Sequence, residues 1–216
     1  MKTNGCGKKI NYFIYALNGE VGEFVDVIKK HLYHDHVLDK TELLKEAGDI
    51  MWSMAYFENF ADGRIDSTKV DEYDKMIANS SYKNHANFKR IYNLNKMPTK
   101  EEIKQMIDIA VLEITAYAGQ ISDSISDTLS ALSLFGSSYT DVVNSFDVVR
   151  SNSSGEYLRS IRMKLEKMLS LISFVVYQLT NESLEKVMIM NIEKLQKRYG
   201  NGFSSEKSIK RVDTNA

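Results

Sequence analysis

The sequence contains few residues that interrupt helices. It has one proline, Pro98, and 11 glycines among 216 residues. Proline and glycine are the residues least compatible with a helix interior, so their scarcity favours long helices. The alternation of polar and apolar residues that marks a half-buried strand is absent throughout the chain. We therefore predict an all-α fold in which residues 1–216 form a single all-α domain.

The chain has only one cysteine, no long apolar run and no excess of charge of either sign. The lone Cys6 cannot form an internal disulfide, which favours a reducing compartment. No run approaches the 18 apolar residues of a membrane span, and no cleavage site follows the first basic residues. The 28 basic and 29 acidic side chains give a net charge of −1. These features predict a cytoplasmic protein with neither a nucleic acid polymer nor a membrane as partner.

Apolar residues recur with the spacing of one helix face in five long segments. The expected helices run over about 8–32, 41–60, 99–136, 156–179 and 182–199, with shorter ones over 70–78 and 139–150. Thr99 and Glu102 have the spacing of a capping box, and Asp39 or Thr41 is the expected cap of the second helix. Trp52 is expected to lie in the core or to stack on a base.

Two pairs of acidic residues share one spacing on the first two helices. Glu20 and Glu23 are three residues apart, and so are Glu46 and Asp49. If these helices pack through their apolar stripes, four carboxylates meet and need a counter-cation. Ligation by oxygen alone suits Mg²⁺ or Mn²⁺ rather than zinc. The alternative is that both pairs lie on ordinary solvated helix faces.

Glycines interrupt both helices beside these carboxylates. Gly19 and Gly22 lie within the first helix and Gly48 within the second. Each costs roughly 1 kcal/mol relative to alanine in a helix interior. Removing the Cβ atom allows a neighbouring helix or a ligand to approach the backbone, which is the role that we predict for them.

The two segments "GEVGEFVDVIKK" and "LLKEAGDIMW" resemble the ExxE and ExxD motifs of MazG-like nucleotide pyrophosphohydrolases, which belong to the all-α NTP pyrophosphatase superfamily. The segment "SLEKVMIMNIEKLQKRYGNGF" resembles the one that closes many of these proteins. The resemblance implies a helical bundle of the MazG-like type. It also implies Mg²⁺-dependent cleavage of NTPs, dNTPs or a related nucleotide between the α and β phosphates, which yields NMP and pyrophosphate.

The resemblance assigns roles to individual residues by matching position. The implied metal ligands and catalytic residues are Glu20, Glu23, Glu46 and Asp49. The residues implied to face nucleotide or phosphate are Asn191, Lys194, Arg198, Tyr199 and, after the first motif, Lys30. Members of the family commonly assemble as dimers or tetramers, so a homo-oligomer is expected. A catalytically silent helical protein that binds nucleotides or a partner is the alternative function.

The chain departs from the compact family pattern because residues 61–180 separate the second motif from the closing one. One explanation is an internal duplication with pseudo-repeats over 8–97 and 99–203. Tyr117 and Gln120 then stand where the first copy has Glu20 and Glu23, and the second copy has lost its metal motif. The other explanation is a large helical insertion.

Overall fold

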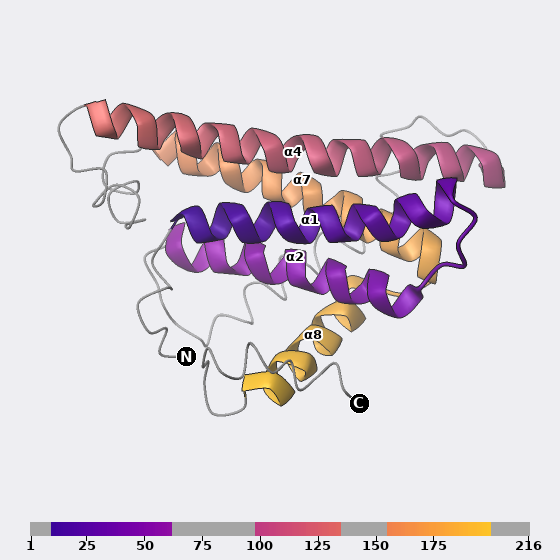
Figure 1. Ribbon diagram of the computed structural model, residues 1–216. Coiled ribbons are helices and arrows are strands. Elements are labelled where there is room, and N and C mark those ends of the chain that lie inside the picture. Colours follow the sequence, from indigo (N-terminus) through magenta and orange to yellow (C-terminus); the bar gives the residue numbers. More distant parts are fainter. Residues whose placement is uncertain (1–9, 62–97, 135–154, 200–216) are drawn as a thin grey trace.

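The computed structural model describes residues 10–61, 98–134 and 155–199. Its helices are α1 (Ile10–Tyr33), α2 (Lys40–Ala61), α4 (Lys100–Leu134), α7 (Gly155–Thr180) and α8 (Leu184–Tyr199) (Figure 1). These residues contain no strand, which confirms the all-α prediction. The short helices expected over 70–78 and 139–150 fall outside the described residues. None of the described helices has the length and apolarity needed to cross a membrane.

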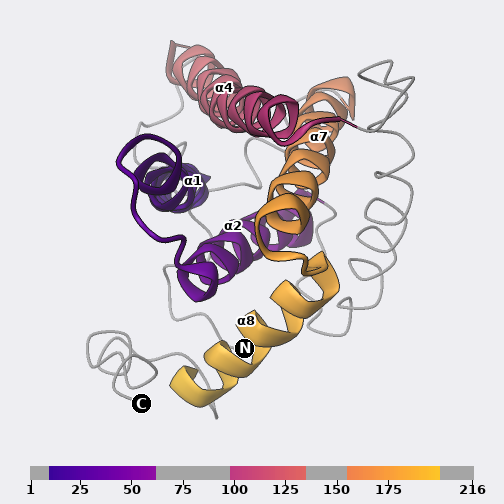
Figure 2. The same ribbon diagram turned by 90° about the vertical axis from the view of Figure 1, so that its right-hand side faces the viewer.

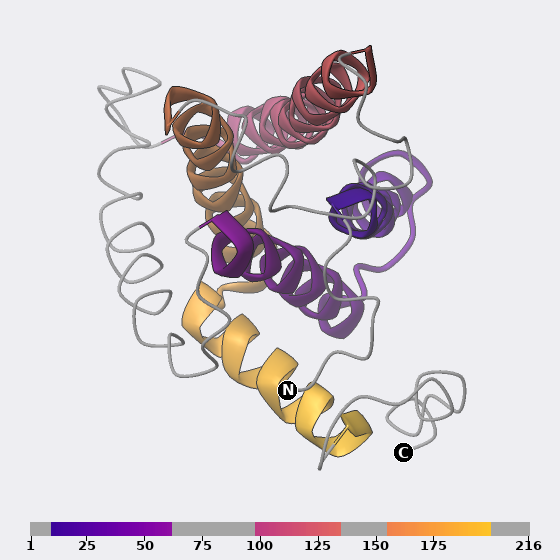
Figure 3. The ribbon, with the colours of Figure 1, turned by 90° about the vertical axis from the view of Figure 1, so that its left-hand side faces the viewer.

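Four of the helices form a bundle, and the fifth packs on its outer side. Helix α1 packs against α2 and α4, and α7 packs against the same two helices, so the four close into a ring. Figures 2 and 3 view this bundle from its two ends and show α8 crossing beneath α2. Because α8 contacts α2, the end of the chain is brought back to the second helix.

Apolar stripes from all four helices fill the interior of the bundle. The stripe of α1 comprises Ile10, Phe13, Leu17, Val21, Phe24 and Ile28, all buried as their spacing predicts. The stripe of α2 is equally buried, but the prediction of a core position for Trp52 is wrong, because its side chain is 44% exposed. Trp52 is two residues from the buried Ile50, and residues two apart on a helix face in different directions.

Side chains cap the helices at the expected positions. The backbone N–H of Glu102 donates to Thr99 Oγ1 at 3.2 Å, and Glu102 Oε2 accepts from the Thr99 N–H at 2.6 Å. This reciprocal pair confirms the predicted capping box. At the start of α2, Asp39 Oδ1 accepts from the N–H of Glu42 at 3.0 Å, so Asp39 rather than Thr41 is the cap.

A tight turn between α7 and α8 directs α8 toward α2. Asn181 has a φ of 63°, in the left-handed region that asparagine tolerates better than most residues. Its N–H donates to the carbonyl of Tyr177 at 2.8 Å and so closes the end of α7. The chain therefore reverses within three residues, 181–183, before α8 begins at Leu184.

Candidate functional site

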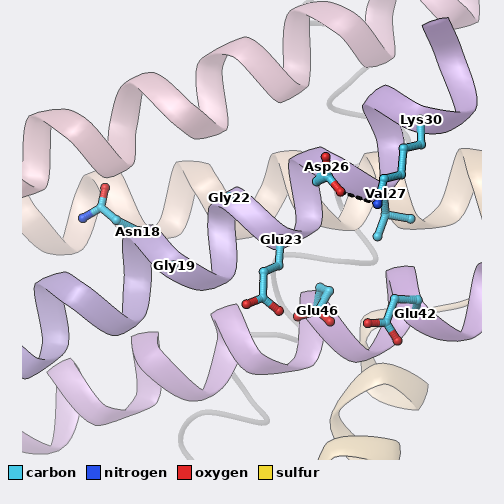
Figure 4. Close-up of a pocket in the computed structure, with 9 residues that line it drawn as sticks. All are labelled: Asn18, Gly19, Gly22, Glu23, Asp26, Val27, Lys30, Glu42 and Glu46. Carbon is cyan, nitrogen blue, oxygen red and sulfur yellow. Dashed lines mark ion pairs between the residues drawn. The ribbon is translucent and has the colours of Figure 1, made fainter. Parts of the chain in front are cut away.

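Three glutamates meet between α1 and α2, beside the apolar stripes that pack these helices together. Glu20 and Glu23 of α1 and Glu46 of α2 each offer an oxygen, and these oxygens lie within 4.8 Å of one another. Figure 4 shows Glu23 extending from α1 toward Glu46. Glu46 is only 1% exposed, whereas Glu23 is exposed to solvent. The arrangement is a half-buried pocket of oxygen ligands.

This cluster has too little positive charge to balance its carboxylates. Burial, together with the nearby Asp49 and Glu23 carboxylates, raises the pKa of Glu20 from 4.5 to about 7. Burial, together with the neighbouring Glu42 carboxyl group, raises the pKa of Glu46 to about 7. Within the described residues, Glu46 Oε2 is also buried without a hydrogen-bond partner. A bound cation or bound protons would satisfy these groups.

A residue that the sequence analysis missed, Lys45, supplies part of the missing charge. Its Nζ lies 3.0 Å from Glu46 Oε1 and 2.9 Å from Glu42 Oε1. Burial opposes its charge, but these two bonds outweigh burial and raise the pKa of Lys45 above its usual value. The spacing of the three residues, Glu42, Lys45 and Glu46, was a signal that could have indicated this pairing.

The fourth predicted carboxylate, Asp49, is held by α8. Asn191 Nδ2 donates to Asp49 Oδ1 at 3.1 Å, and Lys194 forms an ion pair with the same oxygen. Asp49 is not one of the three carboxylates within 4.8 Å, yet it lies close enough to Glu20 to raise the pKa of that residue. The closing motif thus reaches the acidic site within one chain.

Asn191 is nearly enclosed at this junction. Its side chain is 7% exposed, and its Oδ1 has no hydrogen-bond partner in the described part of the chain. Since its amide group donates to Asp49, Oδ1 is the atom left to accept a hydrogen bond. The same residue therefore offers one satisfied donor and one unsatisfied buried acceptor at the site.

The other predicted binding residues are Lys30 on α1 and Arg198 and Tyr199 at the end of α8. Lys30 lines the cavity beside the glutamates and forms an ion pair of 2.6 Å with Asp26. Arg198 is in the last turn of α8, seven residues beyond Asn191 and so about 10 Å further along the helix. Tyr199 ends α8, and its side chain lies outside what the structure describes.

Gly48 permits the close contact between α2 and α8. A Cβ atom at this position would lie 2.6 Å from Asn191 Nδ2 and 3.0 Å from Asn191 Cβ. Such distances are shorter than any ordinary contact, so Asn191 can lie here only because residue 48 has no side chain. The predicted role of this glycine in close helix approach is confirmed.

Gly19 and Gly22 have a different environment. A Cβ atom at either position would find no atom of the described residues within 4 Å, so none of the described helices approaches them. Both instead line a cavity of about 460 Å³ together with Glu23, Glu46 and Lys30 (Figure 4). The prediction of a neighbouring helix at these two glycines is therefore wrong, while room for a ligand remains consistent with the cavity.

The contact at Gly48 yields a prediction on stability. We expect Gly48→Ala to lower the free energy of unfolding by roughly 1–2 kcal/mol, because overlap with Asn191 outweighs the better helix propensity of alanine. Gly119→Ala, on another helix, is the matched control, since its Cβ would have no atom of the described residues within 4 Å. The control should gain up to about 1 kcal/mol. Urea denaturation measures both, and equal gains would show that Asn191 does not pack against Gly48.

One comparison with known proteins matches the part of the chain that holds the acidic site. Residues 9–79 match the family model of the MazG nucleotide pyrophosphohydrolase domain. This segment contains α1, α2 and all four predicted acidic ligands. The resemblance is therefore confirmed over these residues. No curated protein and no solved structure matches the chain.

Proposed function

We propose, from the MazG domain over residues 9–79, that this protein is a Mg²⁺-dependent nucleotide pyrophosphohydrolase. Its substrates would be NTPs, dNTPs or a related nucleotide, cleaved between the α and β phosphates to NMP and pyrophosphate. The observation that carries the proposal is the cluster of Glu20, Glu23 and Glu46 inside the matched segment. The family match suggests the reaction class, and the cluster offers carboxylates that suit it.

The residues present fit a divalent metal. The cluster offers oxygen ligands alone, and the buried Glu46 Oε2 has no hydrogen-bond partner among the described residues. Proteins of this family typically depend on a divalent metal, and such a donor set suits Mg²⁺ or Mn²⁺. Glu20, Glu23 and Glu46 would hold the ion, with Asp49 as the fourth ligand. When bound, the ion neutralises phosphate charge and lowers the pKa of a water ligand.

The closing motif would hold the nucleotide. Lys194 and Asn191 now bind Asp49 of α2, next to the glutamates. We infer that the Lys194 ammonium turns from Asp49 to a phosphate oxygen when nucleotide binds, since both partners are anionic oxygens. This exchange would release Asp49 for the metal. The unsatisfied Asn191 Oδ1 would accept a hydrogen bond from the nucleotide.

Further cations and open space would accommodate the rest of the substrate. Lys30 and the cavity of about 460 Å³ lie on the α1 side of the glutamates, where Gly19 and Gly22 leave the backbone uncovered. Arg198 and Tyr199 would contact the nucleotide from the end of α8. Arginine is well suited to this role because its guanidinium binds phosphate through two parallel hydrogen bonds.

A panel assay tests the proposal. The protein is incubated with each common NTP and dNTP in Mg²⁺, and pyrophosphate is detected after conversion to phosphate by a coupled pyrophosphatase. We expect at least one substrate to give NMP and pyrophosphate, with no turnover in EDTA. Nucleotide binding without hydrolysis of any triphosphate would instead support the silent binding protein. Products of NDP and phosphate would contradict cleavage between the α and β phosphates.

A further inference from the structure

A second cavity lies between α4 and α7, away from the pair of helices that carries the glutamates. Its volume is about 280 Å³, and the described residues that line it all come from these two helices. Helix α4 contributes Tyr117 and Gln120, and α7 contributes Arg159, Lys164 and Lys167. Figure 1 shows α4 and α7 running side by side. The two cavities belong to different helix pairs, because the described lining of the first comes from α1 and α2 and that of the second from α4 and α7.

The lining of this cavity is strongly basic. Arg159, Lys164 and Lys167 bring three positive charges, and no aspartate or glutamate among the described residues lines the cavity with them. None of the three forms an ion pair with a carboxylate in the described residues, whereas Arg162 on the same helix pairs with Glu58 at 2.9 Å. Three neighbouring cations that form no ion pair with a described carboxylate repel one another, and an anion would relieve this repulsion.

Two contacts order the lysines at the cavity wall. The Nζ of Lys167 lies 5.6 Å from the centre of the Tyr117 ring, which is within the range of a cation–π interaction. The Nζ of Lys164 donates to Ser160 Oγ at 3.2 Å. Neither a hydroxyl nor an aromatic face neutralises the positive charge of a lysine. Each ammonium group has three N–H donors, so both lysines keep donors for an anion.

If the chain contains the internal duplication, this cavity has a counterpart in the first half of the chain. Tyr117 and Gln120 stand where the first half has Glu20 and Glu23, and the first cavity is lined by Glu23 and Glu46. In that alignment Tyr117 and Gln120 replace two glutamates, whereas Glu166 keeps the place of Glu46 but is not among the described residues that line the cavity. A site of this composition would repel a metal ion and attract an anion.

We propose that the cavity between α4 and α7 binds an oligophosphate anion, either inorganic or as the phosphate chain of a nucleotide. Several adjacent phosphates match three cations better than a single charge does, and each lysine can donate charge-assisted hydrogen bonds to them. Arg159 adds a guanidinium that can bind two phosphate oxygens at once. The proposal does not depend on hydrolysis at the glutamate site.

Isothermal titration calorimetry with inorganic tripolyphosphate tests the site. The titration uses the full chain in EDTA at about 0.15 M salt, because the glutamates repel phosphate when no divalent ion is present. We expect wild-type protein to bind and the double variant Lys164→Gln, Lys167→Gln to bind about tenfold more weakly or worse. The matched control Lys100→Gln, Lys104→Gln removes the same two charges from α4, outside the cavity, and should retain wild-type affinity.

The outcomes distinguish a specific anion-binding site from nonspecific electrostatic attraction of the anion to the protein. No binding by the wild type, or an equal loss in both double variants, would overturn the proposal. Titration with ATP identifies the recognised group: equal affinity for ATP and tripolyphosphate assigns recognition to the phosphate chain, and tighter binding of ATP adds contacts with the nucleoside. Circular dichroism checks that both variants keep their helix content. If the protein hydrolyses no nucleotide in the panel assay, the result of the tripolyphosphate titration is unaffected.

Discussion

Replacing Glu46 by glutamine is expected to abolish nucleotide hydrolysis and at the same time to make the metal-free protein more stable. Glu46 is the most buried member of the glutamate cluster, at 1% exposed. Glutamine has nearly the same shape but no charge, so it would be a poor metal ligand. We expect the rate to fall on the order of 100-fold or more, since even loss of a residue that supports a ligand costs 10- to 100-fold.

The gain in stability has a separate physical cause. The folded protein keeps the Glu46 carboxyl in a site that disfavours its charge, as the pKa of about 7 indicates. At pH 8 the carboxylate is ionised and destabilises the fold, whereas glutamine is neutral. Lys45 retains its bond to Glu42 in the variant. We expect the free energy of unfolding in EDTA to rise by roughly 1–3 kcal/mol.

Urea denaturation at pH 8 and the pyrophosphate assay together measure both effects. Glu113→Gln is the matched control, because it makes the same chemical change at an exposed position on α4. The control should leave both hydrolysis and stability unchanged. A Glu46→Gln protein that loses hydrolysis and stability together would contradict a metal-binding role and would indicate that the carboxylate supports the fold.

The second large effect is a dependence of stability on pH that Mg²⁺ reverses. Glu20 and Glu46 both have pKa values raised from 4.5 to about 7 in the folded protein. The folded state therefore holds these protons more strongly than the unfolded chain does. Their stabilising contribution is complete below pH 4.5, falls as the pH rises to about 7, and is lost above it.

We expect the metal-free protein to lose on the order of 3 kcal/mol between pH 4.5 and pH 8 from these two groups. Solvent screening of the half-buried Glu20 reduces its share of this loss. At pH 8, Mg²⁺ at 100 times its dissociation constant should add about 2.7 kcal/mol. At pH 4.5 the same concentration should add much less, because protons then compete for the carboxylates.

Thermal denaturation over this pH range, with Mg²⁺ or with EDTA, measures the effect. The double variant Glu20→Gln, Glu46→Gln supplies the comparison, since it should flatten the pH dependence between 4.5 and 7 and abolish the response to Mg²⁺. A wild-type protein that becomes more stable as the pH rises through this window in EDTA would contradict the raised pKa values of the two glutamates.

The sequence by itself determined the helices and the acidic pairs. Apolar spacing identified all five helices described, because a helix that buries one face must repeat its apolar residues with the helical period. The capping box at Thr99 and Glu102 was equally readable, since its hydrogen bonds join residues only three apart. Local chemistry of this kind is encoded within a few residues.

Only the tertiary structure decided which of these groups meet. Asn191 and Lys194 reach Asp49 because the turn at Asn181 brings α8 beneath α2, and the fit depends on Gly48. Periodicity indicates which face of a helix is buried but not which helix covers it. For the same reason, the open backbone at Gly19 and Gly22 and the basic cavity between α4 and α7 could not be read from spacing alone.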